Sequence, residues 1–264
     1  MRVFGCLVAA TALCFTPMAV AVSAGGPAPA PPAALPAALP AAAVGQVAIV
    51  QAVPDATVDV NIDGKSVQAG VVTGKVLGPY PLAVGKHQVD FSGGGVSQAT
   101  TVHVVAGSDQ DVVLHLPASV GGAAVVTAYQ TPDKPIGPGK ARVLVAHTAT
   151  VAPADVQVDG TIVFTNIANG EFATADVPAG KHVVALFPTG QDDGDPILGP
   201  LTVDLAPQTV TNVYAIGNPA DNSMSLVAHT AVLKADGTLV PQMVATGTAG
   251  LAGDLRVRTF GPSS

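Results

Sequence analysis

The stretch Val58-Asp59-Val60-Asn61-Ile62-Asp63-Gly64 decides the fold, because apolar and polar residues alternate through it and the alternation then stops at a turn. A period of two places Val58, Val60 and Ile62 on one face of a strand and the polar residues on the other. Asp-Gly is a strong hairpin signal, since glycine adopts positive φ without steric cost. The stretch therefore predicts a half-buried strand that leads into a tight hairpin.

The same pattern returns about 96 residues later, where residues 154–160 read Ala-Asp-Val-Gln-Val-Asp-Gly. Each stretch is followed at the same distance by a glycine, Gly74 or Gly170, and later by Gly-Lys-His at residues 85–87 or 180–182. A period of this length matches a small domain and is too long for a solenoid repeat. The chain is therefore predicted to carry two copies of one domain.

Strand-like alternation continues through both copies, with frequent turn residues and no convincing helical period. This favours an all-β fold of two tandem antiparallel β-sandwich domains, with about seven strands in each. The expected boundaries are 44–131 for copy 1 and 141–233 for copy 2, with a linker at 132–140. Residues 234–264, rich in Gly, Thr and Ala, are expected to form a flexible tail.

The N-terminus is typical of an export signal. Residues 1–24 hold one early basic residue, an apolar stretch and small residues before a cleavage point after Ala24; an uncleaved membrane anchor is the alternative. Residues 25–43 contain only Gly, Pro, Ala and Leu and predict an extended spacer. Both cysteines, Cys6 and Cys14, lie within the signal, so the mature chain is expected to have no disulfide. No later stretch is apolar enough to span a membrane.

The charge of the chain limits the kinds of partner that it is expected to bind. It has 11 basic and 18 acidic residues, a net charge of −7, and no run of Lys or Arg that would neutralise phosphates. We therefore expect no binding to nucleic acid. Tryptophan is absent and aromatic residues make up 4% of the chain, so aromatic platforms for sugars or bases are not expected either.

The motifs resemble those of the DUF4397 family of secreted and surface bacterial proteins. Copy 1 shows the resemblance at residues 54–60, Asp63-Gly64 and residues 84–87; copy 2 retains Asp155-Val156 and Pro178-Ala179-Gly180 but lacks the opening Pro-Asp. The family often has a histidine near the end of the first strand, where Gln51 stands in copy 1 and His147 lies in copy 2. Over residues 46–232 the resemblance implies an immunoglobulin-like or prealbumin-like sandwich, often in tandem. It implies no catalytic residues.

The candidate site residues are carboxylates and histidines. Asp59 and Asp63, like Asp155 and Asp159, share a strand face but lie roughly 13 Å apart, too far for one acid–base pair. The histidines have no metal-ligand spacing: His87 and His182 occupy equivalent strand starts, and the others are His103, His115, His147 and His229.

One acidic loop offers a possible metal site. Asp192, Asp193 and Asp195 supply three carboxylates within four residues, as a calcium loop requires, although they lack the spacing of an EF-hand. A hydrated loop is the alternative. No other cofactor is expected.

These features predict an exported, non-enzymatic protein that is secreted or associated with the cell wall. We expect a binding or structural module of the bacterial cell envelope, with an envelope polymer or surface protein as partner. If it has a ligand, the loops at Pro54–Thr57 and Asp192–Asp195 are the expected contacts, because the loops of a sandwich cluster at its ends. The alternative is a secreted or periplasmic protein that binds a small ligand or depends on a cation. The sequence leaves the ligand and the oligomeric state open.

Overall fold

The computed structural model describes residues 43–241, and its first half contains eight strands. They are β1 Val44–Gln51, β2 Thr57–Ile62, β3 Lys65–Val72, β4 Val76–Ala83, β5 Gly85–Gly93, β6 Val96–Val104, β7 Asp109–His115 and β8 Val125–Gln130. The predicted export signal, spacer residues 25–42 and tail residues 242–264 lie outside the described residues.

The second half contains nine strands. They are β9 Lys140–His147, β10 Ala154–Val158, β11 Thr161–Ile167, β12 Phe172–Pro178, β13 Gly180–Pro188, β14 Leu198–Leu205, β15 Thr209–Ile216, β16 Ser225–Leu233 and β17 Leu239–Pro241. Apart from one 3-10 turn, Pro219–Asp221, the described residues form no helix, which confirms the all-β prediction. None of residues 43–241 therefore forms a helix long and apolar enough to cross a membrane.

The strands form four sheets, and the strand order of the first half recurs in the second. The first half has an inner sheet, β4-β1-β7-β8, and an outer sheet, β3-β2-β5-β6. The second half has an inner sheet, β12-β9-β15-β16-β17, and an outer sheet, β11-β10-β13-β14. Adding eight to each strand number of the first half gives the second, and β17 is the one addition. The repeated motifs thus correspond to a repeated arrangement of strands.

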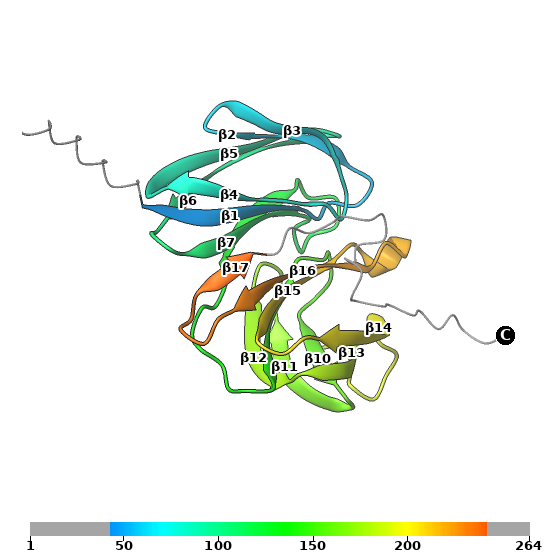
Figure 1. Cartoon of the computed structure of the whole chain (residues 1–264). Helices are drawn as coiled ribbons and strands as arrows, with labels where there is room; N and C mark the ends of the chain where they lie inside the picture. The colour runs from blue at the N-terminus through cyan, green and yellow to red at the C-terminus, as the bar shows by residue number, and fades with distance from the viewer. Residues whose placement is uncertain (1–42, 242–264) are drawn as a thin grey trace, which may run out of the picture. The chain divides into compact units, whose positions relative to one another are not determined.

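Three groups of apolar side chains fix the order of these layers. The inner and outer sheets of the first half share one core, which includes Ile49, Val60 and Phe91. The two sheets of the second half share another, which includes Val156 and Leu186. A third group lies between the two inner sheets. Its members include Val50 on β1 and Ile216 on β15. The sheets therefore follow one another as outer, inner, inner, outer (Figure 1).

One part of the expected topology is wrong. The sheets are not purely antiparallel, because β1 pairs with β7 in parallel and β9 pairs with β15 in the same way. The alternation of residues along a strand reports which face is buried, but it carries no information on the direction of the neighbouring strand.

The segment after the second copy also has regular structure within the described range. Residues 234–241, assigned from the sequence to a flexible tail, form a turn and the short strand β17, which pairs with β16.

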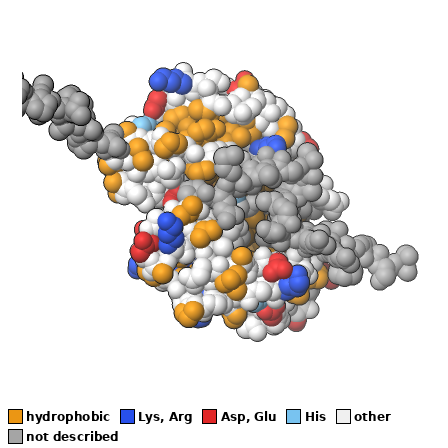
Figure 2. Space-filling view, viewed as in Figure 1, with side chains coloured by type: hydrophobic (Ala, Val, Ile, Leu, Met, Phe, Trp, Pro, Cys, Tyr) orange, Lys and Arg blue, Asp and Glu red, His pale blue; other side chains and the backbone are white. Residues whose placement is uncertain are grey.

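The described surface has sparse charge. On the face that Figure 2 shows, Lys and Arg side chains lie as isolated groups near Asp and Glu, between uncharged and apolar areas. This distribution agrees with the low charge content of the sequence.

Candidate functional site

The repeated Asp-Gly and Gly-Lys-His motifs meet in space. Asp63, at the β2–β3 turn, lies 2.6 Å from His87 through its Oδ2 and the imidazole Nδ1. Asp159 contacts His182 in the same way at 2.7 Å. In each pair the second carboxylate oxygen accepts a hydrogen bond from the backbone N–H that follows the histidine. The motif therefore fastens a hairpin turn to the strand beside it, once in each half.

The electrostatics of these pairs fit that structural role. The hydrogen bond with Asp63, together with the Ala83 carbonyl, raises the pKa of His87. Burial opposes the rise at His182, but Asp159 and a backbone carbonyl still raise its pKa overall. Both imidazoles have their two nitrogens engaged. Neither histidine offers a free nitrogen for chemistry.

The other strand carboxylates serve different turns. Asp59 accepts a hydrogen bond from the Gly70 N–H at 2.8 Å. Asp155 accepts one from Asn166 at 2.7 Å and one from Gly190 at 2.9 Å. The two carboxylates on each strand thus act separately, as their spacing predicts.

The residue at the end of the first strand pins the following loop in both halves. The Gln51 side chain accepts from the Val53 N–H and donates to the Ala56 carbonyl. His147 stands at the equivalent place, and its Nε2 lies 3.2 Å from the Ala152 carbonyl oxygen. Gln51 therefore shapes the loop at Pro54–Thr57, one of the two loops expected to contact a ligand.

The acidic loop does not gather into a site. Asp192, Asp193 and Asp195 are exposed and lie between β13 and β14. Across residues 43–241, no group of three or more His, Cys, Asp or Glu side chains is placed to hold a metal ion. The structure therefore does not bring these three carboxylates together.

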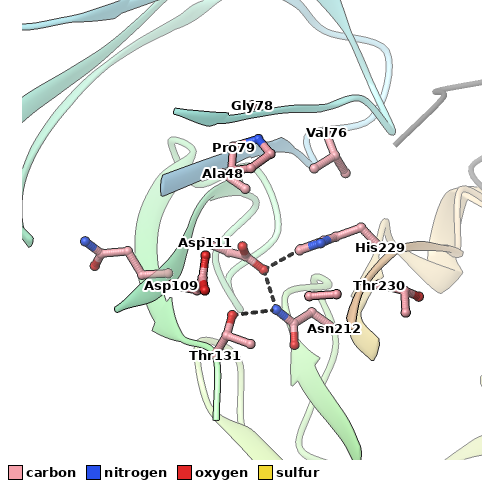
Figure 3. A pocket seen from close by; sticks show the side chains of 12 residues that line it. Ala48, Val76, Gly78, Pro79, Asp109, Asp111, Thr131, Asn212, His229 and Thr230 are labelled. Carbon is pink, nitrogen blue, oxygen red and sulfur yellow. Dashed lines mark hydrogen bonds and ion pairs between the residues drawn. The ribbon is translucent and has the colours of Figure 1, made fainter. Parts of the chain in front are cut away.

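A polar cluster that is largely buried lies between the two inner sheets, and we call it the interface cluster. It consists of Asp111 on β7 together with Asn212, Tyr214 and His229 from β15 and β16. Asp111 Oδ2 lies 2.8 Å from Asn212 Nδ2 and 2.6 Å from His229 Nε2, and it also accepts a hydrogen bond from the Tyr214 hydroxyl. Figure 3 shows Asp111 facing His229 and Asn212, with Thr131 accepting a hydrogen bond from Asn212.

Burial and charge act against each other in this cluster. Burial alone would raise the pKa of Asp111, but the His229 charge and three donated hydrogen bonds hold it below its usual value. Burial would likewise lower the pKa of His229, and the Asp111 carboxylate raises it instead. The cluster therefore contains a buried ion pair with supporting hydrogen bonds, which is the condition under which buried charges are tolerated.

The space beside the cluster is small. A cavity of about 30 Å³ is lined by Asp109, Asp111, Asn212 and His229, with Val76 and Pro79 opposite. This volume suits water rather than an organic substrate. Burial, with the charge of Asp111, raises the pKa of Asp109 to about 6. Because one Asp111 oxygen receives three donors from the other half, the arrangement joins the halves rather than presenting a reactive group.

The interface cluster brings equivalent positions of the two halves together, as a contact with twofold symmetry does. Strand register makes Asp111 equivalent to Asn212, because Asp111 faces Ala48 in the parallel β1–β7 pair and Asn212 faces Leu144 at the same position of the β9–β15 pair. Asp111 and Asn212 contact each other directly, as equivalent residues do at the centre of a twofold contact. The two inner sheets therefore present the same face to each other.

Sequence reasoning did not find this cluster. The alternation along β7 places Asp111, Val113 and His115 on the face opposite Val112 and Leu114, and a polar residue on that face predicts contact with solvent. All five are buried: the outer sheet covers Val112 and Leu114, and the second inner sheet covers the face of Asp111. The apolar Val113 between two polar residues was the one available signal that both faces are covered.

A second, larger cavity lies inside the second half. Its volume is about 60 Å³, and strands β9–β16 line it with side chains that are apolar except for His182 and Thr211.

Comparison with known proteins then assigns one part of the chain. Residues 45–154 match the family model described as Domain of unknown function (DUF4397). The chain carries a DUF4397 domain. This match spans β1–β8, continues through β9 and ends at the first residue of β10.

Other comparisons add little. No curated protein matches the chain. A solved structure of the Bacillus anthracis TIE protein is similar over 66% of this chain and 34% of its own, at 13% identity and a TM-score of 0.23. This chain thus spans about a third of that protein, and the low TM-score does not define a shared topology.

Proposed function

We propose that this protein is a non-enzymatic binding or structural module of the bacterial cell envelope, exported and then secreted or retained at the wall. The observation that supports it best is the interface cluster. The polar side chains of this cluster, Asp111 and its partners, join two β-units to each other. A module that carries ligands or force between a surface and a partner needs such a fixed connection.

The fold of each half, the export of the protein and its location belong to the same proposal. Each half is an immunoglobulin-like or prealbumin-like sandwich, and the second half is a diverged DUF4397 copy. The recurring strand order and the recurring Asp–His pair support this. Residues 1–24 act as the export signal, residues 25–43 as a spacer, and a wall polymer or surface protein is the partner.

Co-sedimentation with isolated cell-wall sacculi of the producing organism tests the proposal. We expect the full exported chain to pellet saturably with sacculi. The absence of pelleting, with and without calcium, would contradict binding to the wall.

A variant pair tests the acidic loop in the same experiment. If calcium strengthens pelleting, the triple change Asp192→Asn, Asp193→Asn and Asp195→Asn should remove the calcium effect. Asp204→Asn is the matched control, because Asp204 is an exposed carboxylate whose contact is with Lys181. An equal response in both variants would move the calcium contact to another part of the chain.

A second candidate function is a secreted or periplasmic protein that binds a small ligand. The apolar cavity inside the second half favours it.

A further inference from the structure

The interior of the second half contains apolar space with no free polar group. The cavity of about 60 Å³ lies between its inner and outer sheets, and representative lining residues are Val143, Val158, Phe164, Ala175, Val184 and Leu226. The two polar lining residues are already engaged. His182 is held by Asp159 and the Pro178 carbonyl, and Thr211 contacts the Thr230 hydroxyl. The walls therefore offer only apolar contact.

The equivalent space in the first half is filled by larger side chains. On the edge strand β4, Tyr80 stands opposite Val47 and Leu77 stands opposite Ile49, and both pack on the core. In the same register of the second half, Ala175 stands opposite Val143 and Ala173 stands opposite Val145. A tyrosine and a leucine are thus replaced by two alanines. Phe164 on β11 is half-buried, as Leu77 and Tyr80 are, and it lines the cavity that remains.

Exposure of the matched valines confirms the difference. Three central valines of the first half are 0% exposed: Val47, Val89 and Val112. Their counterparts in the second half carry the same side chain at the same register and are only half-buried: Val143, Val184 and Val213. Protein interiors are normally packed to crystal-like density, and an unfilled core is destabilising. Water-accessible valines at the centre of a two-sheet core therefore point to an occupant.

The opening lies where the large side chains are missing. Edge strands β11 and β12 border the cavity through Val163, Phe164, Ala175 and Val177, and Val163 is 41% exposed. In the first half the corresponding edge is closed by Leu77, Tyr80 and Leu82. A ligand can therefore enter between β11 and β12.

We infer that the second half binds an unbranched aliphatic chain, such as the acyl chain of a lipid or fatty acid, between its two sheets. Valine, leucine and alanine walls gain from burying methylene groups and offer nothing to a polar head group, which stays outside. A cavity of roughly 150 Å³ holds a benzene ring. About 60 Å³ therefore takes the terminal carbons, and the remaining methylenes lie along the half-exposed valines. This site goes beyond the proposed wall-binding function and does not depend on it.

Fluorescence titration with 11-(dansylamino)undecanoic acid tests the site on the full chain. We expect saturable binding of one probe per chain, with displacement by dodecanoate and none by butanoate. Ala175→Leu, which adds three carbons to the cavity wall, should weaken probe binding about tenfold or more, because the added carbons occupy the site. Thr174→Leu is the matched control, since it adds a leucine to the exposed face of the same strand. It should leave the affinity unchanged.

A second measurement locates the probe without relying on a variant. In methyl NMR of the unmodified protein, probe binding should shift the methyl signals of Val143, Val184 and Val213 and leave those of Val47, Val89 and Val112 in place. Absence of saturable binding would overturn the inference. Shifts confined to the first half, or equal binding by a folded Ala175→Leu variant, would also overturn it. Failure of the chain to pellet with sacculi would leave this result unaffected.

Discussion

The two halves pair their strands in one order, yet the first half fills its interior and the second does not. In the first half Tyr80 and Leu77 close the edge of the core, and the central valines are fully buried. In the second half alanines stand at those registers, and the same valines are half-buried. Backbone pairing and the turn contacts of Asp63 and Asp159 thus specify the topology without specifying how the core is packed. A repeated domain can keep its strand order while one copy acquires internal space.

The largest expected effect comes from breaking the contact that holds the two halves together. Asp111→Ala removes the acceptor shared by Asn212, Tyr214 and His229 and leaves these groups buried without their partner. Loss of one partner of a buried ion pair costs about 3–5 kcal/mol of unfolding free energy. Guanidinium denaturation measures this loss, and two separate transitions would allow the stability of each half to be compared directly.

The control for that variant is Asp204→Ala. Asp204 pairs with Lys181 on the surface, and an exposed pair contributes about 1 kcal/mol or less. A loss at Asp111 as small as that at Asp204 would mean that the interface cluster does not hold the halves together.

The next largest effect compares the packing of the two cores, because the same substitution is made at matched positions of the two halves. Val89→Ala removes two methyl groups from a filled core and should cost about 2 kcal/mol, including the cavity that remains. Val184→Ala makes the same change at the matched position beside existing space and should cost less than about 1 kcal/mol. Urea denaturation of both variants provides the comparison. Equal losses would show that the second core is as well packed as the first.

The smallest expected effect concerns the Asp–His pair that both halves contain. NMR titration of the imidazole signals should give pKa values above 6.5 for both His87 and His182. Because each pKa is raised on folding, the stabilisation by each protonated histidine is complete below pH 6.5 and is lost as the pH rises through the folded pKa.

One substitution tests whether the two Asp–His pairs titrate independently. Asp63→Asn should return the pKa of His87 toward 6.5 and leave that of His182 unchanged, because the carboxylate beside His182 is Asp159. A shift at both histidines would indicate that the two Asp–His pairs are coupled through the interface between the halves.

Much of the fold follows from local residue patterns. The alternation through Val58, Val60 and Ile62 gives the buried face of β2, and Asp63-Gly64 gives the turn after it. The 96-residue repeat indicates the repeated strand order. The parallel pairing of β1 with β7 could not be predicted in this way, because strand direction depends on the path of the whole chain.

The sites were harder to predict than the fold. The repeated motifs indicated that Asp63 and His87 have equivalents in the second half. Their contact joins the β2–β3 turn to β5, 24 residues later, and is not visible in either motif alone. Alternation in β7 predicts a solvated face for Asp111, since nothing within the strand reveals that a second sheet covers it. The cavity depends on Ala175 standing where Tyr80 stands in the first half, and one fewer residue between the motifs in copy 2 hides that correspondence in the sequence.

The contact between Asp111 and Asn212 also explains an advantage of placing both units in one polypeptide. A single unit that paired with itself through this face would set one buried carboxylate against an identical carboxylate. Such like charges disfavour association unless one of them takes up a proton. Two units in one chain are free to differ, so the junction holds an acid on one side and an amide on the other, with His229 nearby to balance the charge. The covalent connection thus permits an asymmetric junction that a homodimer of identical units could not make.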